Sequence, residues 1–164
     1  MAEKDRGARG GSLVSWLVLV LWVCVIWGHS LLSGPISSTE SGFFMDLMRR
    51  ALVFLHLDRL SIVSRLIDDP QLFHHVVRKG AHFSEYFVLG LLTFNALRRS
   101  FTSLLLCGLA LVAIGAGVPC IDEFIQRFTP ERAGQLRDVL LDMSGFACAM
   151  VLCLLAMLLF PRRR

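Results

Sequence analysis

The chain has 164 residues, of which 55% are hydrophobic and 18% are charged. A typical soluble domain has roughly 45–50% apolar and about 25% charged residues, so this composition excludes a disordered chain, a secreted disulfide scaffold and a large soluble enzyme. The net charge is +4, but the basic residues stand at the ends of apolar runs and form no single stripe. This distribution argues against nucleic acid as a partner.

Four stretches of the chain lack Asp, Glu, Lys and Arg, and they predict an all-α integral membrane four-helix bundle. A membrane span needs roughly 20 apolar residues, because the hydrocarbon layer is about 30 Å thick and a helix rises about 1.5 Å per residue. A signal peptide is the rival interpretation of the first run, but its length and the three later runs favour an uncleaved anchor. The predicted spans are about 12–32, 80–97, 101–122 and 138–160.

The basic residues near the span ends predict the orientation of the chain. They precede the first run, separate the second from the third, and follow the fourth at 162–164. By the positive-inside rule, this pattern places both termini of a multi-pass protein in the cytoplasm. We expect residues 1–11 to form a disordered cytoplasmic tail and residues 161–164 a basic cytoplasmic tail, with 12–160 as the membrane domain.

Residues 43–78, between the first two spans, are predicted to form an amphipathic helical segment on the outer side. Apolar residues recur at helical spacing there, and the opposite side of the helix carries Asp46, Arg49 and Arg50. This pattern is typical of a helix in the membrane interface, although a helix packed on the ends of the bundle fits it equally well. The stretch 68–70 predicts a break and a new helix start, because proline is favourable at the first helical position.

Polar residues form three patches near the ends of the last three spans. A simple apolar bundle does not require such residues for its fold. Because successive spans run in opposite directions, all three patches are expected at the outer membrane face. Spacings of three and four residues place His82, Glu85 and Tyr86 on one helix face. The predicted ligand-binding residues are His82, Glu85, Tyr86, Asp122, Glu123, Gln126, Arg127, Arg132, Arg137, Asp138 and Asp142.

The cost of burying charge makes these patches informative. A carboxylate at mid-membrane costs about 2.5–3.5 kcal/mol on insertion scales unless it is neutral, paired or hydrated. We therefore expect an outward-opening polar pocket between the last three helices, with Arg132 or Arg137 as a partner for the acids. A charge that complements the helix dipole is the simpler interpretation of Asp138. His29, beside Ser30 near the outer end of the first span, could join the pocket, but an interfacial histidine is the simpler interpretation.

No metal site and no cofactor is predicted. The five cysteines contain no CxxC pair, and the adjacent His74 and His75 would point to different helix faces. The chain contains no Walker, Rossmann, HExxH or GxSxG pattern.

Two motifs, KGAHFSEYFVLG and DEFIQRFTPERAGQLRDVLLDMSG, resemble the VanZ-like family of small bacterial polytopic membrane proteins. The resemblance covers about residues 12–160. The chain departs from the family pattern at Glu131, Asp142 and Ala149, where glycine, asparagine and glycine are common. The matching residues are Lys79, His82, Glu85, Tyr86, Leu89, Gly90, Asp122, Glu123, Gln126, Phe128, Pro130, Arg132, Gly134, Asp138 and Gly145.

The resemblance implies a protein of the bacterial cytoplasmic membrane, linked in the family's namesake to low-level resistance to the glycopeptide teicoplanin. The pocket residues favour a non-enzymatic protein that binds a membrane lipid, a lipid-linked cell-wall precursor or a lipoglycopeptide antibiotic. In this interpretation Arg127, Arg132 and Arg137 donate hydrogen bonds to an anionic group.

Two alternatives remain open. One is an intramembrane enzyme acting on a lipid head group, with Glu85 or His82 as general acid or base. The other is a cation or proton site formed by the acids of the patches, Glu85, Asp122, Asp138 and Asp142, together with His82.

Overall fold

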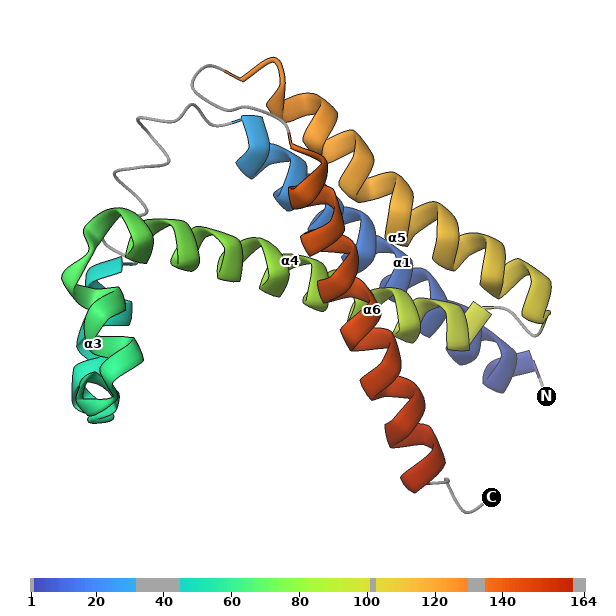
Figure 1. Cartoon of the computed structure of the whole chain (residues 1–164). Helices are drawn as coiled ribbons and strands as arrows, with labels where there is room; N and C mark the ends of the chain where they lie inside the picture. Colours follow the sequence, from blue (N-terminus) through green and yellow to red (C-terminus); the bar gives the residue numbers. More distant parts are fainter. Residues whose placement is uncertain (1, 32–44, 101–102, 130–134, 161–164) are drawn as a thin grey trace.

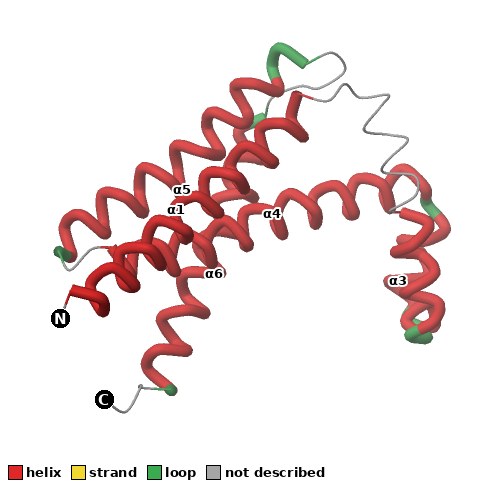
Figure 2. Tube along the Cα trace, turned by 180° about the vertical axis from the view of Figure 1, so that it is seen from behind, coloured by secondary structure: helices red, strands yellow, loops and turns green. Residues whose placement is uncertain are grey.

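The computed structural model describes residues 2–31, 45–100, 103–129 and 135–160, and the regular structure in these ranges is all helical (Figure 1). This confirms the predicted all-α class. Figure 2 shows the same helices from behind, joined by short loops where the connections are described. The elements are α1 (Ala2–Leu31), a helical segment over 45–54, the short 3-10 helix η1 (Leu57–Arg59), α3 (Ser61–Asp68), α4 (Pro70–Ser100), α5 (Leu104–Gln126) and α6 (Leu136–Leu159).

Four long helices pack together and position the polar patches. α4 packs mainly on α6 and α1, and α5 packs on the same two helices. The segment 45–68 projects away from this assembly, beside the first turns of α4 (Figure 1). α1 and α5 end, and α6 begins, at one end of the assembly, which we call the cluster end. α4 ends and α5 begins at the other, which we call the Ser100 end.

Three of the described helices are long and apolar enough to cross a membrane. They contain the stretches Gly11–Leu31, Leu104–Gln126 and Leu136–Leu159. The predicted span over 80–97 is the C-terminal part of the 31-residue α4, which is not among them. Charged residues along α4, such as Glu85 and the arginine pair at 98–99, lower its hydropathy. The four-span bundle is therefore not confirmed.

Glycines allow α4 and α6 to approach closely. A Cβ atom added at Gly145 would lie 2.4 Å from the carbonyl oxygen of Phe83, and one at Gly90 would lie 2.7 Å from the Cβ of Ala149. Such distances are inside van der Waals contact, so only glycine fits at these two positions. Gly145 lies three residues after Asp142 on α6, so this contact brings the start of α6 against the part of α4 that carries His82.

The N-terminal residues differ from the expectation. Residues 2–11 continue α1, so the prediction of a disordered tail is wrong for this stretch. The sequence AEKDRGAR contains mostly residues of good helix propensity, which favours continuation of the helix. The predicted C-terminal tail, 161–164, lies outside the described residues.

The predicted amphipathic segment is divided into several pieces. Within 45–78 the chain forms the helix over 45–54, then η1, α3 and the first turns of α4, while 43–44 lies outside the described residues. The predicted break at 68–70 is present. Asp69 Oδ1 accepts hydrogen bonds from the backbone N–H groups of Gln71 (3.0 Å) and Leu72 (3.1 Å), and this caps α4. Phe54 and Ile62 are more than 80% exposed, so much of the apolar surface of this segment is uncovered.

Candidate functional site

Polar side chains from α1, α4, α5 and α6 meet at the cluster end of the four long helices. The residues come from positions far apart in the chain, and most lie within or beside the apolar stretches of their helices. We call this group the polar cluster. Its members are His29, His82, Glu85, Tyr86, Asp122, Gln126 and Asp142.

The deepest part of the polar cluster is formed by His82, Asp122 and Asp142, which we call the buried triad. One ligand atom of each residue lies within 4.8 Å of the corresponding atoms of the other two. His82 Nδ1 is 3.6 Å from Asp142 Oδ1, which is longer than a hydrogen bond. Both aspartates are fully buried, with 0% of their surface exposed. The triad therefore contains two carboxyl groups without access to bulk water and a largely buried imidazole.

Several polar atoms in this region make no hydrogen bond to any described residue. They include both carboxylate oxygens of Asp142, Oδ1 of Asp122, Nδ1 of His82 and the hydroxyl of Tyr86. A buried polar atom without a partner costs about 1–3 kcal/mol, so folded proteins seldom leave several of them together. The buried triad and Tyr86 thus hold unused hydrogen-bonding and metal-ligating capacity at one place.

Other polar contacts hold Asp122 in position. Gln126 Nε2 donates hydrogen bonds to Asp122 Oδ2 (3.1 Å) and to Ser30 Oγ (3.3 Å). Thr129 Oγ1 donates to the backbone carbonyl of Ser30 at 3.0 Å. The sequence analysis did not identify Ser30 or Thr129 as supporting residues. The signal was the pair His29 and Ser30 at the polar end of an otherwise apolar run.

The edge of the polar cluster is partly exposed. His29 Nδ1 lies 3.2 Å from Glu85 Oε1, and their side chains are 37% and 22% exposed. The indole N–H of Trp22 donates to the backbone carbonyl of Glu85 at 3.0 Å, which ties α1 to α4 at this level. His29 is therefore more than the separate interfacial histidine that the sequence favoured, because it contacts the acid of α4.

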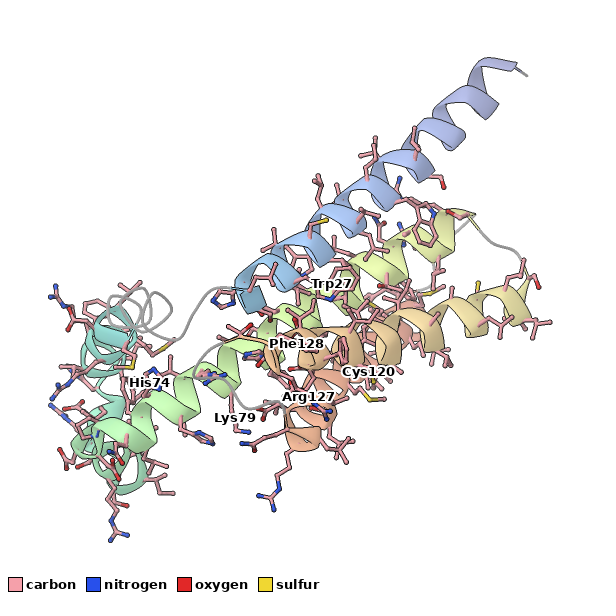
Figure 3. All side chains as sticks on the ribbon, turned by 90° about the horizontal axis from the view of Figure 1, so that it is seen from above. Trp27, His74, Lys79, Cys120, Arg127 and Phe128 are labelled. Atoms are coloured by element: carbon pink, nitrogen blue, oxygen red, sulfur yellow. The ribbon has the colours of Figure 1, made fainter. Side chains whose placement is uncertain are left out.

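A second ion pair lies next to this edge. Lys79 Nζ and Asp138 Oδ1 are 2.6 Å apart, and Figure 3 shows Lys79 extending from α4 toward the beginning of α6. Asp138 thus has a direct partner on another helix in addition to its place in the first turn of α6. Glu123 has a different role, since its carboxylate accepts a hydrogen bond from the backbone N–H of Gln135, at the start of α6.

Two of the three predicted arginines lie in the described part of the chain. Arg127 and Arg137 are exposed, and within the described ranges neither forms an ion pair with the acids of the cluster. The sequence named Arg132 or Arg137 as the partner of these acids, and of the two Arg137 does not pair with them. Arg137 directly precedes Asp138, and consecutive helical residues point about 100° apart, so the two cannot face the same groove. Arg132 lies outside the described residues.

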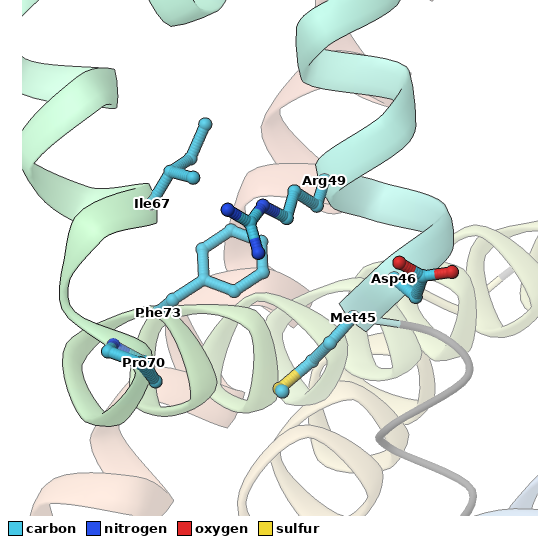
Figure 4. A pocket seen from close by; sticks show the side chains of 6 residues that line it. All are labelled: Met45, Asp46, Arg49, Ile67, Pro70 and Phe73. Atoms are coloured by element: carbon cyan, nitrogen blue, oxygen red, sulfur yellow. The ribbon is translucent and has the colours of Figure 1, made fainter.

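A separate pocket of about 190 Å³ lies between the segment 45–54, α3 and the start of α4. Figure 4 shows Arg49 and Phe73 extending into it from opposite sides. Ligand pockets for small molecules measure about 300–1,000 Å³, and none of the predicted ligand-binding residues lines this one. Its lining residues are Met45, Asp46, Arg49, Ile67, Pro70 and Phe73.

Comparison with known proteins supports the resemblance noted in the sequence. A family model described as VanZ/LLP1 matches residues 15–159, a range that contains the whole polar cluster. No curated protein and no solved structure matches the chain.

Proposed function

Because the chain belongs to the VanZ/LLP1 family, we propose that it is a non-enzymatic membrane protein of the bacterial envelope that binds the head group of an amphiphile. The ligand is a membrane lipid, a lipid-linked cell-wall precursor or a lipoglycopeptide antibiotic. The observation that carries the proposal is the partly exposed ionisable edge of the polar cluster, at one end of an apolar helix assembly.

The chemistry of this edge suits a head group with mixed polar groups. Glu85 and Asp138 accept hydrogen bonds from hydroxyl, amide or amine groups, which sugars and peptides supply in number. Arg127 and Arg137 are exposed at the same end of the assembly and suit a phosphate or carboxylate. Arg132, the remaining predicted anion donor, belongs to the same proposal on sequence grounds alone.

Apolar surface beside the polar edge suits the lipid part of such a ligand. Phe124 and Phe128 at the end of α5 are 58% and 74% exposed, and their rings pack edge to face with centroids 5.0 Å apart. Exposed aromatic side chains next to a polar site fit a ligand that has both a head group and a hydrocarbon chain.

The setting is part of the proposal. The flanking basic residues favour a multi-pass protein of the cytoplasmic membrane with both termini in the cytoplasm, which puts the polar cluster on the outer side. From that position, binding of a lipoglycopeptide or of its lipid-linked target would lower sensitivity to teicoplanin.

Binding by the full-length protein in phosphatidylcholine nanodiscs tests the proposal, with a polyprenyl diphosphate lipid and teicoplanin as the two probes. We expect saturable binding of at least one probe and a loss of about 10-fold or more in affinity in Glu85→Gln, which removes a charged acceptor. The matched control is Asp46→Asn. It removes an exposed carboxylate that is paired with Arg50 and lies outside the polar cluster. Failure of both probes to bind, or equal binding by Glu85→Gln, would contradict the proposal.

A further inference from the structure

The buried triad lies beneath the edge that a head group can reach. Asp122 and Asp142 have no exposed surface, so a sugar, peptide or phosphate group cannot contact them without rearranging the helices. A single ion is small enough for such a site. We infer that His82, Asp122 and Asp142 bind a divalent transition-metal ion, of which Zn²⁺ and Mn²⁺ fit the ligand set best. This inference goes beyond the proposed lipid binding and does not depend on it.

The spacing of the ligand atoms fits one shared ion. Nitrogen and oxygen ligands lie about 2.0–2.2 Å from Zn²⁺, so two of them in a tetrahedral site are about 3.4 Å apart. His82 Nδ1 and Asp142 Oδ1 are 3.6 Å apart, and the third ligand atom, from Asp122, lies within 4.8 Å of both. This separation is too long for a hydrogen bond and close to the distance between two ligands of the same metal.

The balance of charge points in the same direction. Two carboxylates in a site without water cost several kcal/mol each unless a positive charge compensates them. Lys79 pairs with Asp138 and His29 with Glu85, so neither of these side chains compensates the two buried carboxylates. A divalent ion with two carboxylate ligands and one neutral imidazole gives a site of zero net charge.

The surroundings of the triad provide independent support. Gln126 donates to Oδ2 of Asp122 and leaves Oδ1 free, as expected for a residue that orients a metal ligand from behind. Tyr86 is fully buried one helical turn after His82, and its hydroxyl interacts with Asp122 and Asp142. This hydroxyl is close enough to the aspartates to occupy the remaining coordination position or to contact a water bound to the metal.

The ligand types narrow the choice of metal. Imidazole together with carboxylate suits Zn²⁺ or Mn²⁺, whereas Cu⁺ prefers thiolates, and Ca²⁺ and Mg²⁺ prefer oxygen ligands alone. Three protein ligands also match the number found at zinc sites that keep one position open.

Metal content tests the inference directly. Full-length protein in phosphatidylcholine nanodiscs, without any probe lipid, is stripped with a chelator, reloaded with Zn²⁺ or Mn²⁺, freed of excess ion and measured by elemental analysis. We expect one ion per chain and a higher thermal unfolding temperature with the ion. Retention of less than a tenth of an ion per chain for both metals would overturn the inference, whatever the lipid experiment shows.

Substitution of single residues tests which side chains bind the ion. Asp142→Asn and His82→Gln should lower affinity about 100-fold or more, and Gln126→Leu about 10-fold, since loss of an orienting residue costs about 10–100-fold. Asp46→Asn is the matched control, because it removes an exposed carboxylate that is paired with Arg50 outside the polar cluster, and it should keep the ion. Wild-type affinity in both Asp142→Asn and His82→Gln would overturn the assignment.

Folding of the variants is checked in the metal-free state. Asp142→Asn removes a buried charge without changing size, so its metal-free unfolding temperature should equal or exceed that of the metal-free wild type. If the variant unfolds instead, the metal-dependent rise in unfolding temperature of the wild type decides the question, and no rise would overturn the inference.

Discussion

The two ends of the four long helices both carry polar residues, but they use them differently. At the Ser100 end, the hydroxyl of Ser100 accepts a hydrogen bond from the Trp16 indole N–H at 2.8 Å and lies 2.6 Å from Ser12 Oγ. Asn95 donates to Ser15 Oγ at 3.2 Å, and its carbonyl accepts from the Arg99 guanidinium at 3.1 Å. Each of these polar groups therefore has a partner, and all except Ser15 are at least partly exposed.

At the cluster end, the polar groups are buried more deeply and have fewer partners. Asp142 is fully buried and neither of its oxygens accepts a hydrogen bond, whereas every buried side-chain polar atom of the Ser100-end network has a hydrogen-bond partner. The polar residues of the Ser100 end have a structural role, because their hydrogen bonds join α1 to α4. A buried group of polar residues without hydrogen-bond partners suits a bound ligand or ion. For this reason we assign the functional site to the cluster end.

The largest effect is expected where the cluster end depends on close helix packing. Gly145→Ala places a Cβ 2.4 Å from the Phe83 carbonyl, so α6 must move away from α4 and carry Asp142 away from His82. We expect a loss of about 1–3 kcal/mol in the free energy of unfolding, as for other overpacked positions. Denaturant-induced unfolding in detergent micelles measures it.

Gly108→Ala is the matched control for this change. A Cβ at Gly108 meets nothing within 4 Å, so the same substitution should be neutral or stabilise α5 by about 0.5–1 kcal/mol. Equal effects of the two substitutions would show that helix propensity decides the result and that the α4–α6 contact does not.

A pair of polar-to-leucine substitutions tests the comparison itself. In the presence of chelator, Asp142→Leu should raise the free energy of unfolding by about 1–2 kcal/mol, because it removes a buried carboxylate that accepts no hydrogen bond. Asn95→Leu should lower it by about 1 kcal/mol, because it deprives Ser15 and Arg99 of their partner. The same denaturation assay measures both. Opposite signs support the distinction between the two ends, and a destabilising Asp142→Leu in chelator would contradict it.

The sequence predicted the apolar helices better than their ends. Gaps in the charge identify stretches that avoid water, and α1, α5 and α6 follow them closely. Such gaps do not report where a helix begins, so the extension of α1 to Ala2 and of α4 to Pro70 was not predicted as part of the spans. Polar residues of good helix propensity continue a helix without leaving an apolar signal.

The juxtaposition of the site residues followed from topology, but their pairing did not. Alternating helix direction is enough to bring the polar ends of α4, α5 and α6 together, and the triad His82, Asp122 and Asp142 agrees with it. Rotation of each helix about its axis is set by packing, which local sequence does not specify. For that reason Lys79 and not Arg137 pairs with Asp138, and His29, for which a place in the pocket was the less favoured interpretation, contacts Glu85.

A smaller effect is expected from a buried hydroxyl between the two ends. Thr93 on α4 is fully buried, and its Oγ1 has no hydrogen-bond partner among the described residues. Thr93→Val keeps the shape and removes this unpaired group, so it should raise the free energy of unfolding by up to about 1 kcal/mol. A thermal unfolding series with and without Zn²⁺ measures it, and the gain should not depend on the ion. A metal-dependent gain would place Thr93 in the same coupled network as the triad.

The smallest effect is expected at the partly exposed pair of Lys79 and Asp138, which lies at the cluster end but is satisfied like the contacts of the Ser100 end. Because both side chains are partly exposed, at 33% and 23%, solvent screens their attraction. A double-mutant cycle with Lys79→Met and Asp138→Asn should give a coupling energy of about 0.2–1 kcal/mol that falls as salt is added. A coupling energy that is larger and insensitive to salt would mean that water does not reach the edge of the cluster in the membrane. The two ends would then differ in how deeply their polar groups are buried, and not in where those groups lie along the helices.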